Sequence, residues 1–187
     1  MSLRKAIEVV AKLAESGAIH RYAIAGAFAA MNYIAPTLSD DLDILISVED
    51  FESRRSGLIL LAAVEKALAE LGYSDRTDLG IMIEGWPVQF LPAASDLDQD
   101  ALDSAIEIEI GSPGGPPLRA RCLRAEHVVA IAIKVGRLKD LARVQSFLDQ
   151  GAVDLFLLKQ VLQRHGLMGD WRRFCVKAGI ENPLVAI

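Results

Sequence analysis

The sequence Ile24-Ala25-Gly26-Ala27 is followed, fifteen positions after the glycine, by Asp41-Leu42-Asp43-Ile44-Leu45-Ile46. The second stretch predicts a buried strand with two carboxylates two residues apart, so that both point to the same face of a sheet. Because neighbouring carboxylates repel each other, such a pair favours a bound divalent cation, a hydrogen-bond network or water. A glycine between a short strand and a helix favours phosphate binding through backbone N–H groups. Together the two stretches indicate chemistry on a metal and a phosphate.

The surrounding sequence predicts a strand, a helix and a second strand in that order. The first strand covers residues 22–25, and the helix runs from Gly26 to about residue 33. That helix must end before Pro36, because a residue that precedes proline avoids the helical conformation. The second strand covers residues 42–48 and is apolar except for its carboxylates. This order places Gly26 and the two aspartates on neighbouring elements.

The rest of the chain has strands in its first part and almost only helices after residue 125. Strands early and helices late indicate an α+β fold, with a mixed sheet flanked by helices and a helical C-terminal part. We expect a core over residues 1–118 and a helical part over residues 119–187, or one domain overall. The other predicted elements are helices at residues 3–14, 58–71 and 101–105, a hairpin of residues 81–84 and 88–91 around Gly85-Trp86-Pro87, a strand at 106–110 and a loop at 111–117.

Composition limits the classes of protein that the chain can belong to. With 187 residues, of which 52% are hydrophobic, the chain can bury a real core. A net charge of -5 argues against a uniformly basic nucleic-acid surface, although a local basic patch lies between Arg119 and Arg143. The two cysteines do not make a disulfide framework, and no apolar run is long enough to cross a bilayer. We therefore expect a cytoplasmic protein with no membrane partner.

Asp41 and Asp43 are the candidate metal ligands and catalytic residues. Mg²⁺ or Mn²⁺ prefers oxygen ligands held close together on a rigid scaffold, and two carboxylates at i and i+2 of a strand meet that need. Asp40 points to the other face or lies in the preceding turn, so we assign it no metal. An Asp-x-Asp pair at the start of a strand also occurs as a cap or a solvent-facing pair. The glycine turn upstream and the apolar stretch downstream favour the metal site here.

The order strand, Gly-Ala, helix and Asp-x-Asp resembles the DNA polymerase β-like nucleotidyltransferase superfamily, and within it most of all the bacterial group of AbiEii-type toxin nucleotidyltransferases. The resemblance covers roughly residues 20 to 150. It implies transfer of a nucleotide from an NTP substrate to an acceptor hydroxyl or amine, with Mg²⁺ or Mn²⁺ on Asp41 and Asp43. It also implies that the turn at Gly26 and Ala27 holds the triphosphate. The acceptor (RNA, a protein or a small molecule) stays open.

The resemblance continues in the segment Lys134-Val135-Gly136-Arg137-Leu138-Lys139-Asp140. In the family, a lysine and an aspartate of this helical segment face the nucleotide, which implies nucleotide-binding roles for Lys134 and Asp140. Arg137 is a further candidate for nucleotide binding. Physically, a lysine beside phosphates is an ordinary point-charge partner. The alternative is a solvated basic helix face.

Two positions depart from the family pattern. Members of the superfamily usually carry a third carboxylate on a later strand, and the corresponding place in this chain has Gln89. An amide can form hydrogen bonds but cannot act as a base at neutral pH. Glu84 is the candidate third metal ligand, and Glu107 and Glu109 are further candidates. Ala27 replaces a serine whose hydroxyl contacts the phosphates, while the backbone donors of the turn remain.

These departures keep two other functions open. One is a catalytically degenerate module that binds a nucleotide or a partner. The other is the toxin of a toxin–antitoxin pair, whose partner would be an antitoxin protein.

Overall fold

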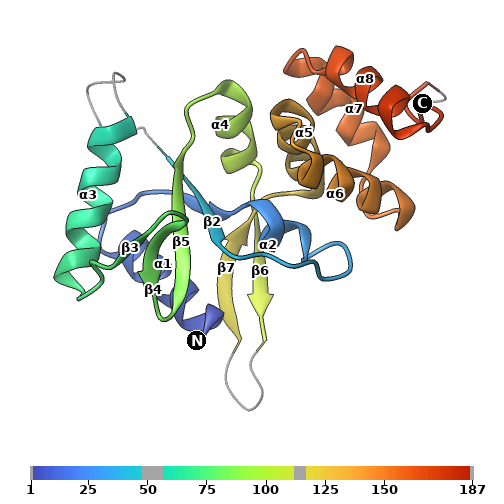
Figure 1. Ribbon diagram of the computed structural model, residues 1–187. Coiled ribbons are helices and arrows are strands. Elements are labelled where there is room, and N and C mark those ends of the chain that lie inside the picture. Colours follow the sequence, from blue (N-terminus) through green and yellow to red (C-terminus); the bar gives the residue numbers. More distant parts are fainter. Residues whose placement is uncertain (1, 48–56, 112–116, 186–187) are drawn as a thin grey trace. The chain divides into compact units, whose positions relative to one another are not determined.

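The computed structural model describes residues 2–47, 57–111 and 117–185. The chain divides into two compact units (Figure 1). The sheet unit comprises Met1–Phe28 and Leu38–Leu123, and the helical unit comprises Ala29–Thr37 and Arg124–Ile187.

The sheet unit contains one mixed sheet and its flanking helices. Its helices are α1 (Leu3–Glu15), α3 (Gly57–Glu70) and α4 (Asp96–Asp103), together with the start of α2 (Gly26–Ala30). Its strands are β1 (Tyr22–Ile24), β2 (Leu42–Ile46), β3 (Arg76–Thr77), β4 (Gly80–Ile83), β5 (Trp86–Pro92), β6 (Ile106–Ile110) and β7 (Leu118–Cys122).

The strand order places β2 near the middle of the sheet. The order is β3-β4-β5-β2-β1-β7-β6. β2 pairs antiparallel with β1 and parallel with β5, and β1 pairs parallel with β7. A sheet with both kinds of pairing, flanked by helices, confirms the predicted α+β class. Because β1 is the direct neighbour of β2, the turn that follows β1 lies beside the aspartates of β2.

Three side chains on one face of β2 belong to the core of the sheet unit. Leu42, Ile44 and Ile46 are fully buried and alternate with Asp43 and Leu45. Since successive side chains of a strand point to opposite faces, Asp43 points away from Leu42 and Ile44. Helix α1 contacts β5, β7 and α3, and α3 also contacts β5. The apolar residues therefore fix the strand and direct Asp43 to the other face.

Most local predictions are confirmed. The helix predicted from Gly26 to about residue 33 is α2, which already ends at Ala30. The predicted hairpin is present, but its turn is Glu84-Gly85, and Trp86 already belongs to β5. Glu84 and Gly85 both have positive φ, of 53° and 83°, as two-residue hairpin turns favour. The predicted helix at 101–105 starts earlier, at Asp96, because Ser95 and Asp98 form a capping box.

Two strands were not predicted: β3 is only two residues long, and β7 alternates arginine with apolar residues. Of the predicted elements, residue 48 of the second strand and residues 112–116 of the loop lie outside the described part of the chain.

The helical unit is built around α5. Its helices are α5 (Ala125–Val135), α6 (Leu138–Asp149), α7 (Leu155–Arg164) and α8 (Met168–Ala178), and α5 contacts the other three. Trp171, Phe147 and Leu158 are fully buried in this unit. Gly136 ends α5 with a left-handed φ of 71°, so Lys134 and Asp140 lie on two successive helices. Among the described residues, no helix combines the length and apolar character that a membrane span requires.

Candidate functional site

The closest contact in the predicted site joins Gly26 to Asp43. Gly26 has a φ of +56° at the start of α2, and the N–H of Ala25 donates to the carbonyl oxygen of Asp43 at 2.9 Å. A Cβ at Gly26 would lie 2.8 Å from Cγ of Asp43, 3.1 Å from its Cβ and closer still to Oδ2. Only glycine therefore fits at this position between β1 and α2. Its positive φ disfavours other residues, and the Asp43 carboxylate occupies the space that a Cβ would need. The structure thus places Gly26 against Asp43, and their role in one functional site stays a prediction.

Asp41 immediately precedes β2, and its local partner is Ser39. The hydroxyl of Ser39 donates to the carbonyl oxygen of Asp41 at 3.0 Å and lies 3.5 Å from its Oδ1. Asp41 and Asp43 are both half-buried, whereas Asp40 is exposed. Ser39 was not predicted as a site residue. The spacing Ser-x-Asp before a strand is the signal that could have found it, because serine hydroxyls commonly bond the backbone two residues on.

Gln89 lies directly beside Asp43. The parallel register of β2 and β5 pairs Asp43 with Gln89, and Leu42 with Val88. Leu42 and Val88 are both buried, at 0% and 1% exposed, whereas Gln89 is exposed. The two strands therefore turn equivalent faces to the core, and the Gln89 amide shares the face of the Asp43 carboxylate. The place next to the aspartate pair holds an amide.

Glu84 has two partners of its own in the hairpin turn. The hydroxyl of Tyr73 donates to Oε1 of Glu84 at 2.7 Å, and Lys5 Nζ lies 4.0 Å from its Oε2. The hydrogen bond to Glu84 raises the pKa of Tyr73. Among the described residues, no group of three or more His, Cys, Asp or Glu side chains is close enough to hold a metal ion. The structure thus does not bring Glu84 to the aspartate pair, and its role as third ligand stays a prediction.

The other two candidate carboxylates belong to strand β6. Glu107 and Glu109 lie 3.4 Å and 3.8 Å from nitrogen atoms of Arg119 on β7. In the strand order, β1 and β7 separate β6 from β2. These glutamates therefore form cross-strand ion pairs away from the aspartates.

The aspartate pair fits a hard divalent cation. Mg²⁺ is usually held by one or two carboxylates, with the remaining ligands coming from water and substrate phosphates. Asp41, directly before β2, and Asp43, within β2, supply two carboxylates two residues apart, with Gly26 leaving room for the second. Two such carboxylates without histidine or cysteine favour Mg²⁺ or Mn²⁺ over zinc.

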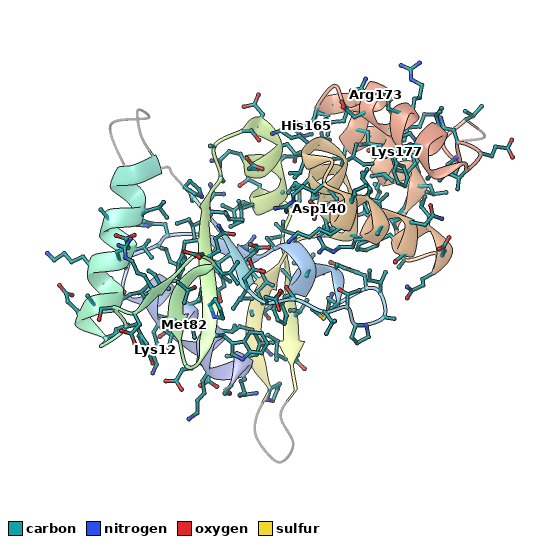
Figure 2. All side chains as sticks on the ribbon, in the orientation of Figure 1. Lys12, Met82, Asp140, His165, Arg173 and Lys177 are labelled. Carbon is teal, nitrogen blue, oxygen red and sulfur yellow. The ribbon has the colours of Figure 1, made fainter. Side chains whose placement is uncertain are left out.

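The predicted residues of the second segment belong to the helical unit. Lys134 and Arg137 are exposed, whereas Asp140 is only 3% exposed. Asp140 lies in the first turn of α6 (Figure 2). The Asp140 carboxylate accepts from Nε of Arg137 at 2.6 Å and from Nη1 of Arg143 at 3.2 Å. Its position near the N-terminus of α6 is also favourable for a negative charge. A role for these residues beside Gly26, Ala27 and the aspartates stays a prediction.

The two cysteines are excluded as nucleophiles by their burial. Cys122 and Cys175 are buried, and neither is part of a disulfide. Burial raises the pKa of Cys122 to about 12 and also raises the pKa of Cys175. Because the thiolate is the reactive form, neither side chain is activated at neutral pH.

Comparisons with known proteins gave one kind of match. No protein-family profile matches the chain, and no curated protein matches it. Among solved structures, the chain is similar to the solution structure of the antibiotic-resistance factor ANT(2'')-Ia, described as showing substrate-regulated conformation dynamics. The identity is 18%, the TM-score is 0.49, and the match covers 93% of each chain. A similarity at this level implies nothing about which residues form a site or which reaction they perform.

Proposed function

We propose that the protein is a nucleotidyltransferase of the DNA polymerase β-like kind, which moves an NMP from an NTP to an acceptor. The contact between Gly26 and the Asp43 carboxylate carries this proposal. It ties the turn that would hold phosphate to the strand that would hold the metal. Gly26 has a φ of +56° and lies directly against the half-buried Asp43 carboxylate, which sets this glycine apart from Gly17 and Gly72, where an added Cβ would meet nothing within 4 Å.

The residues of the site would have two separate roles, metal binding and triphosphate binding. Asp41 and Asp43 would hold a divalent cation, and the backbone N–H groups of the turn at Gly26 and Ala27 would receive the triphosphate. Such a cation neutralises phosphate charge and lowers the pKa of a bound hydroxyl. The acceptor atom attacks the α-phosphorus, the bond between that phosphorus and its bridging oxygen to the β-phosphate breaks, and pyrophosphate leaves. The aspartates act by positioning and charge, as phosphoryl transfer requires.

Transfer of a label from an α-phosphate-labelled NTP, with Mg²⁺ or Mn²⁺ and a set of acceptors, tests the proposal. We expect label transfer by the native protein and none by the double variant Asp41→Asn, Asp43→Asn. The double variant Asp75→Asn, Asp78→Asn is the matched control, because both aspartates are exposed, one on either side of β3, and it loses the same two charges. Transfer that survives in the double variant would exclude these aspartates as the catalytic pair.

A second function is favoured by the amide beside Asp43. With Gln89 at that place, the site would bind a nucleotide without turning it over, as a sensor or partner-binding module. Calorimetry of NTP and metal, run beside the transfer assay, separates the two functions. Binding without turnover supports the sensor, and the absence of NTP binding excludes both.

The role as a toxin of a toxin–antitoxin pair is supported by the sequence resemblance alone. Expression that arrests growth, with recovery in the double aspartate variant, would support it. Normal growth on expression would contradict it.

A further inference from the structure

We propose that the acceptor of the transfer is a phosphomonoester and that Gln89 determines this specificity. The inference rests on the proposed nucleotidyltransferase function and names the acceptor class of that same site. Its basis is the register of β2 and β5, which sets the Gln89 amide beside the Asp43 carboxylate.

The register fixes which face of the sheet the two side chains share. Neighbouring strands lie about 4.8 Å apart, and residues paired in a parallel register point to the same face. Leu42 and Val88, one position earlier on each strand, are both buried. Asp43 and Gln89 therefore share the opposite face, where Gln89 is exposed to an incoming molecule.

An amide at this place cannot serve a neutral hydroxyl acceptor as a base. A hydroxyl must lose a proton when its oxygen attacks phosphorus, and an amide does not take up a proton at neutral pH. Among the described residues of the sheet unit, no third His, Cys, Asp or Glu groups with Asp41 and Asp43. The two aspartates themselves are assigned to the cation. The proton of a hydroxyl acceptor thus has no protein group to receive it among these residues.

A phosphomonoester removes this difficulty. Its second pKa is about 6, so its oxygens are already negatively charged at pH 7. One of these oxygens attacks the α-phosphorus, pyrophosphate leaves, and a new P–O–P bond forms without any proton leaving the acceptor. The Gln89 NH₂ group can donate a hydrogen bond to the attacking phosphate. A carboxylate at the same place would repel it.

Matched acceptor pairs test the assignment. The probes are ribose 5-phosphate and other sugar phosphates, each with its dephosphorylated counterpart, and inorganic phosphate, which would yield the NDP. With labelled NTP and Mg²⁺ we expect transfer to the phosphorylated member of each pair to be at least about 100-fold faster than to the other, because the lack of a positioned proton acceptor usually costs a rate factor of that order.

The isosteric variant Gln89→Glu provides a second readout. Its added charge should weaken binding of the phosphomonoester, followed by phosphorus NMR titration, by about tenfold, because a like charge within about 5 Å repels the phosphate. Gln163→Glu, at an exposed position of α7, controls for the change in net charge. NTP affinity is measured for each protein in parallel.

The outcomes separate the two proposals. Preference for phosphorylated acceptors together with weaker phosphate binding by Gln89→Glu supports the assignment. Preference for hydroxyl acceptors, unchanged phosphate binding by Gln89→Glu, or NTP binding without transfer to any probe overturns it and leaves the nucleotide site in place. Absence of NTP binding by the native protein overturns the proposed function as well.

Discussion

Replacement of Gly26 by alanine is the sharpest structural perturbation of the candidate site. The φ of +56° is a left-handed conformation that costs an L-residue about 1–2 kcal/mol. The new Cβ would also lie 2.8 Å from Cγ of Asp43, so the carboxylate must leave its rotamer, at a further cost of about 1 kcal/mol. We expect Gly26→Ala to lower the free energy of unfolding by about 2–3 kcal/mol, or Tm by roughly 4–10 °C.

Gly17→Ala is the control that separates the two contributions. Gly17 has a φ of +77°, but a Cβ there would meet nothing within 4 Å, so this variant carries the backbone strain alone. Calorimetric melting gives Tm for both variants, and Mn²⁺ titration gives the metal affinity. Displacement of Asp43 should weaken Mn²⁺ binding by about 10–100-fold in Gly26→Ala and leave it unchanged in Gly17→Ala. If the two variants were destabilised equally and bound Mn²⁺ with equal affinity, the contact between Gly26 and Asp43 would have no part in the metal site.

Three further predictions follow from charged and titrating groups. Asp140→Asn should lower the free energy of unfolding in urea by about 2–3 kcal/mol, because it leaves the mostly buried Arg143 without its anion; no change would contradict a structural ion pair. Burial raises the pKa of Cys122 to about 12, so the folded state favours the neutral thiol. The free energy of unfolding should therefore fall as pH rises from about 9 toward 12, by at most about 1.4 kcal/mol per pH unit. Melting measured across this pH range should lose this dependence in Cys122→Ala. Glu84→Gln should lower the pKa of Tyr73 in an ultraviolet titration, because it removes the carboxylate that accepts the Tyr73 hydrogen bond. The Mn²⁺ affinity of the same variant tests Glu84 as a third metal ligand. A weaker affinity supports that role, and an unchanged affinity contradicts it.

The local part of the fold could be predicted from the sequence because its signals are local. The alternation of Leu42, Ile44 and Ile46 with Asp43 defines a strand, and the proline at position 36 limits the preceding helix. The sequence resemblance gives Gln89 the place of a third carboxylate on a later strand, and in the register of β2 and β5 Gln89 is paired with Asp43. Each of these features is set by a few adjacent residues.

Non-local features could not be predicted in the same way. The fit of Gly26 against Asp43 depends on the antiparallel pairing of β1 with β2, which no short pattern encodes. Likewise, nothing in residues 29–37 signals that they group with residues 124–187. The burial of Asp140 depends on Arg143, whose side chain is only 13% exposed, and a basic helix pattern does not distinguish a buried arginine from a solvated one.

Binding of Mn²⁺ in the presence of an NTP, followed by electron paramagnetic resonance, tests the central claim most directly. The native protein and Asp78→Asn should bind the Mn²⁺–NTP complex with equal affinity. Asp43→Asn should lose at least about 1.4 kcal/mol of binding free energy, a tenfold change, because an amide is a weaker ligand than a carboxylate. Equal affinity in all three proteins would show that Asp43 does not hold a metal and would contradict the nucleotidyltransferase site.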